Sequence, residues 1–499
     1  MASWSEGAAS TLADMSKVPG RAAGTQSHDI PKGQALAEFM AKGWADSSLE
    51  GVRPAAVVDF AAARRAKLSA LYPGIRLVIP AGTFKVRSND TDFKFRAHTA
   101  YAYLTGISAS DCVPDSVLVL EPTKDGHEAL LYIHPRSPRD TNEFHSDRRH
   151  GEFWVGRRLS TDETEVRYGI SVRHIDTLPD LFDDEVETLT VRGEDPVVDG
   201  LVERHKKREA KFLIALSEMR LIKDSYEIEE LQKAIDVTAR GFSDMVQSFR
   251  AAISVKRGER IIESAFYGRA RLEGNELGYD TIAAAGSHAC VLHWIKNDGD
   301  VLPGDLILID AGAEVESMYT ADITRTLPIN GKFSPAQRKI YTLVYEAQKA
   351  GIAAVKPGAP WRAFHDAASA VLAKGLEEFG VLPGTAEESL AEDAGFHRRW
   401  TVHATGHMLG LDVHDCAHAR EESYREGLLE EGMVLTVEPG LYIQPDDLLF
   451  PAEYRGIGVR IEDDILVTAT GSKVLSQSLP SHPDAVSYTH LTLPTKRIV

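Results

Sequence analysis

Apolar residues recur at helical spacing in several long stretches of the chain. In residues 56–71 and 203–238 they recur every three or four positions with charged residues between them, which predicts amphipathic helices. A break at 221–224 divides the second stretch, and we place a domain boundary there. Two further helices are predicted for residues 334–355 and 361–379.

Short runs of apolar, β-prone residues bounded by Gly, Pro or Asp predict strands. Because these runs alternate with helices without a strict strand–helix–strand rhythm, we expect an α+β fold with an antiparallel or mixed sheet. The predicted strands are 75–79, 116–120 and 129–133 in the first part of the chain, and 301–309, 434–443 and 457–467 in the second.

A chain of 499 residues is too long for one ordinary core, so two or three domains are expected. We divide it into a polar arm (1–35), an N-terminal α/β domain (36–215), a second domain (216–485) and a tail (486–499) to which we assign no function. The arm is rich in Ser, Gly and Ala and is expected to be disordered or loosely docked. The last residues, 487–499, have the pattern of neither helix nor strand.

The composition narrows the class of protein. With 43% hydrophobic and 26% charged residues, the chain has the make-up of a soluble globular protein. No run approaches the ~18 apolar residues of a membrane span, and the start lacks the apolar core of a secretory signal, so we expect no membrane partner. The 3 cysteines lie far apart and fit a reducing cytoplasm. The net charge of −18 disfavours nucleic acid, whose phosphates need a basic surface.

Four acidic residues occupy positions where a charge is costly. Asp310 and Glu438 directly follow apolar, β-prone runs, Glu462 follows Val459-Arg460-Ile461, and Asp322 leads the run Ile-Thr-Arg-Thr. A buried, unpaired carboxylate costs several kcal/mol, and neighbouring carboxylates repel one another unless a cation lies between them. The pattern therefore predicts a divalent-metal site.

Three histidines lie within 12 residues, between two pairs of these acids, at positions 403, 407 and 414. The spacing of His403 and His407 resembles a zincin helix, but that motif needs Glu after the first His, and position 404 is Ala. Gly406 and Gly410 further disfavour a helix. The cluster is therefore more typical of a loop that lines a site.

The ligand chemistry indicates which metals fit. One imidazole and four carboxylates form a hard, oxygen-rich set that suits Mn²⁺ and also accepts Co²⁺ or Zn²⁺. Four acids are too many for one metal with an open position, whereas two metals ~3.5–4 Å apart can share them. We therefore expect two divalent metal ions, with Mn²⁺ as the preferred cofactor.

Taken together, these residues resemble the pita-bread metallopeptidases, the family of methionine aminopeptidase, prolidase and aminopeptidase P. The resemblance covers about residues 221–474 and rests on several motifs in the family order. They are His293, Asp310-Ala-Gly, Asp322-Ile-Thr-Arg-Thr, His403-Ala-Thr-Gly-His407, Val-Glu438-Pro-Gly and Arg460-Ile-Glu462-Asp-Asp. In the N-terminal part, Phe95-Arg96, Tyr103-Leu-Thr-Gly106 and Trp154-Val-Gly-Arg157-Arg158 resemble the creatinase-N-terminal-like α/β domain, which methionine aminopeptidase lacks.

The resemblance implies a role for each candidate residue. Asp322 and Glu462 would bridge the two metals. The hydroxide between the metals would attack the scissile carbonyl, and Glu438 would carry the proton to the leaving proline nitrogen. The implied metal ligands are Asp310, Asp322, His407, Glu438 and Glu462. The implied catalytic residues are His293 and His414, which would stabilise the oxyanion and position the substrate, together with Glu438, His403 and Arg460, the last two orienting the carboxylates. Tyr442, four residues past Glu438, could contact the same shell.

One departure from the family concerns Asp322. The spacing of 12 between Asp310 and Asp322 is one residue longer than is usual, which a bulge or the turn of an antiparallel hairpin can absorb. We keep Asp322 as the ligand because Ile-Thr-Arg-Thr follows it, and treat Glu314 and Glu316 as the alternatives. The tail after about Ala485 also departs from the family.

The expected activity is hydrolysis of the bond before proline, releasing the first residue of peptides with proline in second position. The alternative is a prolidase, which acts on Xaa-Pro dipeptides. A metal-free creatinase-like hydrolase is disfavoured because all five ligands are present, and a non-catalytic scaffold because it would have lost ligands or gained basic patches. The resemblance also implies a homo-oligomer, either a dimer or a tetramer, in the cytoplasm.

Overall fold

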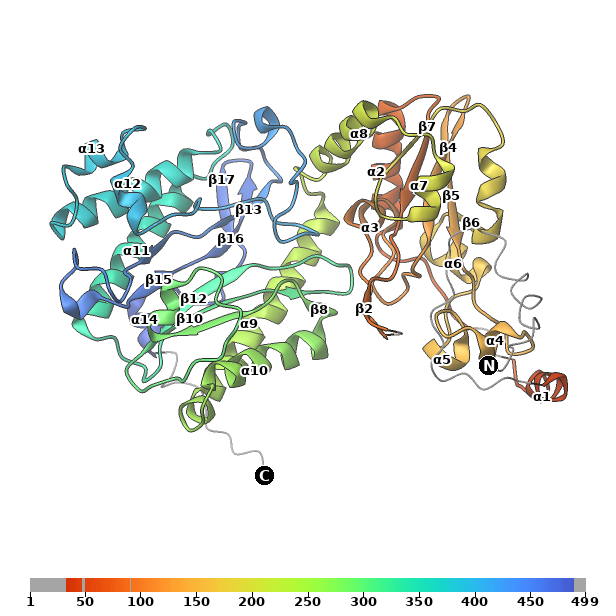
Figure 1. Ribbon diagram of the computed structural model, residues 1–499. Helices are drawn as coiled ribbons and strands as arrows, with labels where there is room; N and C mark the ends of the chain where they lie inside the picture. Colours follow the sequence, from red (N-terminus) through yellow and green to blue (C-terminus); the bar gives the residue numbers. More distant parts are fainter. Residues whose placement is uncertain (1–32, 47–49, 90, 489–499) are drawn as a thin grey trace, which may run out of the picture. The chain divides into compact units, whose positions relative to one another are not determined.

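The computed structural model describes residues 33–46, 50–89 and 91–488. The expected N-terminal arm falls almost entirely outside this part of the chain. Two compact units result, residues 1–216 and 217–499, and each is described by itself below (Figure 1). Among the described residues, no helix combines the length and the apolar character needed to span a bilayer.

The first unit is built on a mixed five-stranded sheet in the order β6-β5-β4-β1-β7. The central pairs β1–β4 and β4–β5 are antiparallel, whereas β5–β6 and β1–β7 are parallel. The strands of this unit are β1 (Arg76–Pro80), β2 (Val86–Ser88), β3 (Thr91–Asp92), β4 (Val117–Thr123), β5 (Gly126–Ile133), β6 (Ser171–His174) and β7 (Thr188–Thr190).

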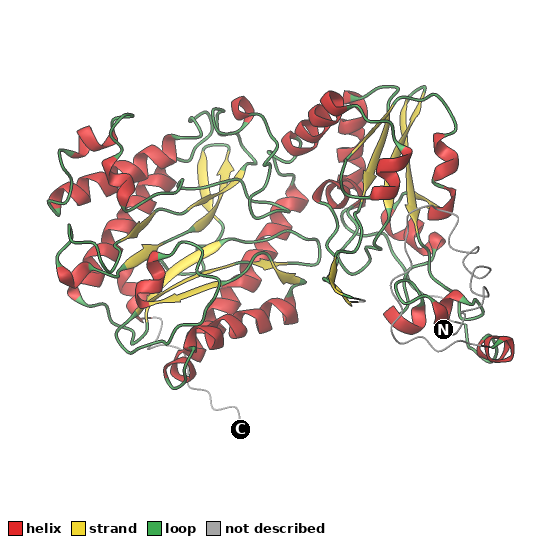
Figure 2. Ribbon diagram, in the orientation of Figure 1, coloured by secondary structure: helices red, strands yellow, loops and turns green. Residues whose placement is uncertain are grey.

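Helices flank this sheet (Figure 2). Buried apolar side chains of the sheet and of neighbouring segments form a hydrophobic core. Val78, Val119 and Val198 are fully buried members of this core. The helices are α1 (Gln34–Met40), α2 (Val58–Leu71), α3 (Thr99–Thr105), α4 (Glu143–Ser146), α5 (Glu152–Val155), α6 (Thr161–Tyr168), α7 (Pro196–Leu201) and α8 (Lys206–Glu218), with 3-10 turns η1 (Ile175–Thr177) and η2 (Pro179–Phe182).

The second unit contains small antiparallel sheets with strand orders β12-β10-β9, β11-β8, β13-β16-β17 and β14-β15. Each pairing joins strands that are near in sequence, either within residues 276–328 or within residues 434–474. The strands are β8 (Glu276–Leu277), β9 (Ile282–Ala285), β10 (Leu306–Ala311), β11 (Ala313–Glu314), β12 (Ile323–Pro328), β13 (Val434–Val437), β14 (Gly440–Tyr442), β15 (Gly458–Arg460), β16 (Asp463–Thr468) and β17 (Gly471–Val474).

Helices of the second unit pack in pairs, α9 with α10 and α11 with α12. The long helix α9 begins with a capping box, in which Asp224 accepts from the backbone N–H of Glu227 and Glu227 accepts from that of Asp224. The helices are α9 (Ser225–Ile253), α10 (Gly258–Glu273), α11 (Pro335–Ala354), α12 (Ala363–Glu378), α13 (Ala386–Leu390) and α14 (Pro483–Tyr488), with 3-10 turns η3 (Gly286–Cys290), η4 (Phe396–Arg399), η5 (Glu421–Ser423) and η6 (Ala452–Tyr454).

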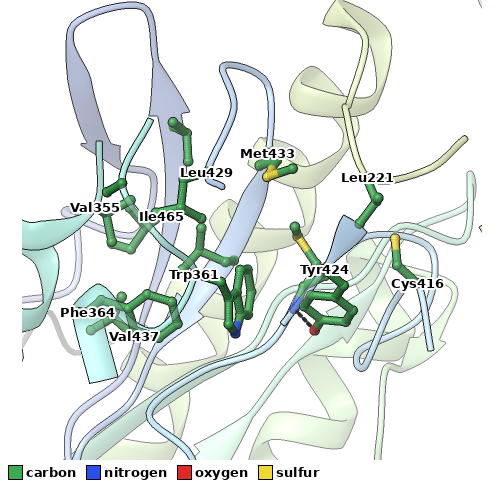
Figure 3. Packing of buried hydrophobic residues seen from close by; sticks show 14 residues of the cluster. Leu221, Val355, Trp361, Phe364, Cys416, Tyr424, Leu429, Met433, Val437 and Ile465 are labelled. Carbon is green, nitrogen blue, oxygen red and sulfur yellow. Dashed lines mark hydrogen bonds between the residues drawn. The ribbon is translucent and has the colours of Figure 1, made fainter. Parts of the chain in front are cut away.

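A buried cluster joins β13 and β16 to the start of α12 (Figure 3). Trp361 packs edge-on against Phe364 and Tyr424, with ring centroids 5.2 and 4.7 Å apart. The hydroxyl of Tyr424 accepts a hydrogen bond of 2.7 Å from the backbone N–H of Met408, whose side chain belongs to the same cluster. The core therefore anchors the chain segment that contains His407.

Most predicted elements are present, with three differences. The run 434–443 is two strands interrupted at Glu438-Pro439, and 457–467 is likewise interrupted at residues 461–462. The prediction that residues 487–499 form neither element is wrong for 487 and 488, which end α14. Val486 in this helix is fully buried, so contacts made by the folded protein stabilise a helix too short to be evident in the sequence.

Candidate active site

The hairpin of β10 and β12 places Asp310 and Asp322 on one side of the sheet. Asp310 pairs with Thr324, and the same register continues through the bridge between Glu314 and Thr320. Gly312 therefore lies opposite Asp322, and residues 310, 312, 322 and 324 share one face, since side chains alternate along strands. The register shows no bulge, so the turn at 316–318, where Met318 has a φ of 67°, takes up the length of the hairpin.

A second ladder places Glu438 opposite Glu462. Val437 pairs with Asp463 in β13 and β16, and Gly440 pairs with Arg460 in β14 and β15. Both pairings have the same register, so the two glutamates face each other where the ladder is interrupted. Because alternate residues share a face, the polar side of this ladder carries Thr436, Glu438, Tyr442, Arg460, Glu462 and Asp464.

His407 lies on a segment that runs beside β13. The backbone N–H groups of Thr436 and Glu438 donate to the carbonyls of His407 and Thr405, at 2.9 Å each. Nδ1 of His407 lies 3.0 Å from the carbonyl of Met408, which can only accept, so this nitrogen is the donor. Its Nε2 lies 3.3 Å from Asp322 Oδ2 and 3.6 Å from Glu438 Oε1. A side chain held by Nδ1 in this way presents Nε2 to the carboxylates.

The electrostatics of the cluster are dominated by excess negative charge. Burial, together with the charges of neighbouring carboxylates, raises the pKa of Glu462 well above its usual value and that of Glu438 to about 7. Burial also raises the pKa of Asp322. Burial alone would lower the pKa of His407, but the hydrogen bond to Asp322 and the charge of Glu438 raise it to about 9. All four pKa values are raised, which means that the cluster favours the binding of positive charge.

Ligand atoms of Asp322, His407 and Glu462 all lie within 4.8 Å of one another, close enough to share a metal ion. Glu438 contacts His407, and Asp310 is joined to Asp322 through Tyr279, whose hydroxyl lies 2.6 and 2.5 Å from the two aspartates. The structure thus brings together all five residues predicted as ligands. Neither alternative acid joins them, since Glu314 accepts from Asn275 and Glu316 is exposed.

Sequence reasoning missed two residues that contact this cluster. Tyr279 bridges Asp310 and Asp322, and Thr324 Oγ1 donates to Glu462 Oε2 at 2.6 Å. Gly312 makes room for the tyrosine, because a Cβ at this position would lie 2.9 Å from its ring and 1.7 Å from the carbonyl of Ala321. Neither Tyr279 nor Thr324 belongs to a charged pattern in the sequence. Only Gly312, two residues after Asp310, could have indicated that another group packs closely at this point.

A chain of hydrogen bonds connects Asp310 to His403. Arg460 donates to Asp310 Oδ2 at 2.6 Å and to the Tyr442 hydroxyl at 2.9 Å. His403 donates from Nδ1 to the carbonyl of Ala404 and accepts at Nε2 from the Tyr442 hydroxyl, both at 2.8 Å. Burial and the charge of Arg460 lower the pKa of His403 to about 4, so the ring is neutral and suited to this pattern.

The two remaining histidines lie at the exposed rim of the cluster. The ring of His414 lies edge-on to that of His407 at a centroid distance of 4.3 Å. His293 is exposed on the segment after β9, and its charge contributes to lowering the pKa of both His403 and His414, after burial in each case. Neither has a hydrogen bond to the four acids among the described contacts, and both side chains are exposed.

Buried Glu259 fixes the segment that carries His293. Its carboxylate accepts from the backbone N–H groups of Ala285 and Gly299, at 2.8 and 2.6 Å, and from the indole N–H of Trp294 at 2.8 Å. It also contacts His288, whose ring stacks on Trp294. Sequence reasoning missed this residue, because a single glutamate in a helix carries no distinguishing signal.

Asp415, next to His414, forms ion pairs with two buried cations. Arg220 donates to one of its oxygens at 2.9 Å and Lys223 to the other at 3.3 Å. Burial alone would raise the pKa of Asp415, but these two charges hold it below its usual value. Replacing Asp415 by Asn should lower the free energy of unfolding by about 3–5 kcal/mol, because two buried cations lose their counter-charge.

Chemical unfolding at neutral pH would measure this loss. Because the pKa of Asp415 is lowered by folding, its contribution is present above the unfolded pKa of ~3.9 and disappears as the pH falls through the folded value. The difference between wild type and variant should therefore shrink in acid. Asp412→Asn is the matched control, since that half-exposed carboxylate lies 3.9 Å from Arg220 and should cost ~0–1 kcal/mol. Equal losses in the two variants would contradict the prediction.

The chain is similar to known proteins over most of its length. The model of "Metallopeptidase family M24" matches residues 229–469, and that of "Aminopeptidase P, N-terminal domain" matches residues 61–191. Xaa-Pro aminopeptidase 1 of Streptomyces coelicolor is 54% identical over 454 residues, covering 90% of this chain and 91% of the relative. Xaa-Pro aminopeptidase of Escherichia coli is 33% identical, covering 86% and 96%.

Solved structures are similar over the same extent. A variant of Escherichia coli aminopeptidase P has a TM-score of 0.76 and 31% identity, covering 86% of this chain and 97% of that chain. Aminopeptidase PepP of Pseudomonas aeruginosa has a TM-score of 0.74 and 31% identity, covering 88% and 99%. These similarities span both units of the chain.

Proposed function

Because the chain belongs to metallopeptidase family M24, we propose that it is a metal-dependent aminopeptidase that releases the first residue of peptides with proline in second position. Its second unit has the pita-bread fold, and an aminopeptidase P-type domain precedes it. The observation that carries the proposal is the convergence of Asp322, His407 and Glu462 within metal-binding reach in such a chain. Relatives that are similar over most of the chain are Xaa-Pro aminopeptidases, which favours this activity over a dipeptide-specific prolidase.

The donor set fits divalent metal ions. The cluster brings four carboxylates together, whereas Arg460, its one permanently charged cation among the described residues, donates only to Asp310 among them. The four carboxylates are those of Asp310, Asp322, Glu438 and Glu462. The raised pKa values of Glu438 and Glu462 reflect this imbalance, which bound cations would relieve. We propose that these four acids and His407 hold two ions, with Asp322 and Glu462 shared between them. Oxygen ligands predominate, so Mn²⁺ is the proposed metal, with Co²⁺ or Zn²⁺ as alternatives.

The bound metals would lower the pKa of a water molecule and polarise the scissile carbonyl. Glu438 is the proposed proton carrier, because its half-buried carboxylate lies at the interruption of the ladder and within 3.7 Å of His403. It would take a proton from the attacking water and deliver it to the proline nitrogen as the bond breaks. His293 and His414, at the exposed rim, would position the substrate and donate to the developing oxyanion.

Arg460, Tyr442 and His403 would act by positioning. Arg460 holds Asp310 through one nitrogen and Tyr442 through another, so the carboxylate has a fixed orientation. The Tyr442 hydroxyl in turn donates to Nε2 of His403, and this bond orients the ring. Supports of this kind set the orientation of metal-binding groups, and their loss typically weakens metal binding by ~10–100-fold.

Selectivity for proline has a physical basis. An Xaa-Pro bond lacks the N–H of other peptide bonds, and the ring holds φ near about −65°. A site built for this bond therefore has no donor to satisfy at that position and can contact the ring with apolar groups. The preformed shape of the substrate also reduces the conformational entropy lost on binding.

Removing the metals is the direct test. Dialysis against a chelator should abolish turnover of an Xaa-Pro tripeptide, and Mn²⁺ should restore it best, because the ligands are mainly oxygen. The assay is release of the first residue, run beside the matching Xaa-Pro dipeptide. Full activity of protein shown to be metal-free by elemental analysis would contradict the proposal. Activity on the dipeptide alone would favour the prolidase alternative.

The cellular setting and assembly are further proposals. The described cysteines, Cys112, Cys290 and Cys416, are free thiols, which supports a reducing cytoplasm. We propose a homo-oligomer, either a dimer or a tetramer, and neither a nucleic acid nor a membrane as partner. Light scattering after gel filtration distinguishes the two assemblies from a monomer.

A further inference from the structure

A second group of metal-binding side chains lies in the first unit, apart from the cluster described above. Ligand atoms of His134, Asp147 and His150 all lie within 4.8 Å of one another. His134 directly follows β5, and the other two follow the short helix α4. The stretch between β5 and α6 is long and contains only the two four-residue helices α4 and α5.

The folding of this stretch brings the three residues together. Oδ1 of Asp147 accepts from the backbone N–H groups of Arg149 and His150, at 2.7 and 2.9 Å, which closes a tight turn. Its Oδ2 lies 3.2 Å from Nδ1 of His150. The rings of His134 and His150 lie 4.1 Å apart at an angle of 33°. Two imidazoles and a carboxylate thus converge from the start and the middle of the stretch.

One nitrogen in this group has no protein partner. Nε2 of His150 is buried and makes no hydrogen bond in the described part of the chain. If Nδ1 donates to Asp147, Nε2 has an unshared electron pair. In the other tautomer, Nε2 has a buried N–H without an acceptor. Both arrangements are costly, because buried polar groups almost always have partners, and a metal bond would remove the deficit.

The charges around the group also fit a cation. Glu143 contacts Nε2 of His134, so two carboxylates adjoin the two rings. Two neighbouring arginines have carboxylates of their own, Arg136 with Glu152 and Arg149 with Asp92. Arg158, which also adjoins the group, donates to the carbonyl of Pro135. The charge of Arg158 interacts with those of Glu143 and Asp147. These two carboxylates carry one more charge than Arg158 can offset, and this excess would help to balance a divalent ion.

We propose that His134, Asp147 and His150 form a second, structural metal site that binds Zn²⁺, with Glu143 as the fourth ligand. Two imidazoles and two carboxylates suit zinc, and four protein ligands leave no open position for chemistry. This site would tie the end of β5 to the segment after α4, and so would order a stretch that has little regular structure. Its role is distinct from catalysis and does not depend on the proposed function.

The test uses the full chain with its catalytic cluster disabled. The double variant Asp322→Asn/His407→Ala is stripped of metal and titrated with Zn²⁺ by calorimetry, with elemental analysis after gel filtration. We expect about one zinc per chain and a higher melting temperature in zinc. Adding His134→Ala or His150→Ala should abolish both effects. His127→Ala is the matched control and should retain them, because both of its ring nitrogens already contact protein, at Ser69 and Ile75.

The proposal can be overturned even if an added substitution prevents the protein from folding. If the double variant itself takes up no zinc, the proposal is overturned. If zinc uptake persists after His134→Ala and His150→Ala, the ion binds elsewhere and the proposal is likewise overturned. His150→Gln provides a second variant of similar shape, and circular dichroism confirms that each variant is folded before titration. In otherwise unaltered enzyme, His150→Gln should leave the turnover of an Xaa-Pro tripeptide unchanged when the catalytic metal is supplied.

Discussion

Replacing Asp322 by Asn should reduce kcat for an Xaa-Pro tripeptide by at least ~10³-fold while leaving the fold intact. Asp322 lies between His407 and Asp310 and is the acid proposed to be shared by both metals. An amide is a weaker ligand than a carboxylate, and a catalytic metal supplies several kcal/mol of transition-state stabilisation, each ~1.4 kcal/mol being tenfold in rate. Steady-state kinetics together with metal analysis would measure both losses.

The controls for this prediction are the two alternative acids. Glu314→Gln changes a buried carboxylate that bonds to Asn275, and Glu316→Gln changes an exposed one. Both should retain activity close to that of wild type. A nearly silent Asp322→Asn combined with an inactive Glu314→Gln or Glu316→Gln would show that the acid was wrongly chosen.

Substitution of His414 should separate catalysis from metal binding. His414 is exposed and lies edge-on to His407 at 4.3 Å, without a hydrogen bond to the acids among the described contacts. His414→Ala should therefore keep about two metals per subunit while lowering kcat by ~10²–10³-fold, or ~2.7–4 kcal/mol, the typical loss of one donor to an oxyanion.

His407→Ala should differ in kind, because its Nε2 lies 3.3 Å from Asp322 and 3.6 Å from Glu438. This variant should lose metal along with rate. Measuring metal content and kcat for both variants side by side decides the matter. Metal loss in His414→Ala with retention in His407→Ala would mean that the ligand and the substrate contact have been exchanged.

Much of the fold could be predicted because periodic patterns cover long elements. The helix predicted for residues 334–355 is α11, and the break placed at 221–224 lies just before the capping box of α9. The prediction of one continuous strand for residues 434–443 overlooked Pro439-Gly440, although Pro cannot donate to a strand ladder and Pro-Gly marks a break. The two-residue strands β8 and β11 were also missed, since pairing and not residue preference defines so short an element.

The candidate site was partly predictable for a different reason. A carboxylate at the end of an apolar run signals its own burial cost, and all four such acids lie together with His407. Tyr279, Thr324 and Glu259 send no such signal, because a neutral hydroxyl or a helix glutamate is compatible with many environments. Their contacts arise only when segments distant in sequence pack together in the fold. The roles assigned to the five ligands stay predictions until metal binding is measured.

The continuous register of the second ladder has a consequence for insertions and deletions. From Val434 paired with Leu466 to Ile443 opposite Ile457, every pair keeps the same alignment. Removing or adding one residue within either strand would turn every later side chain to the opposite face, so that Arg460 and Tyr442 would exchange places with core residues. Between residues 434 and 466, a change of length therefore preserves this alignment only if it falls in the connection between residues 443 and 457.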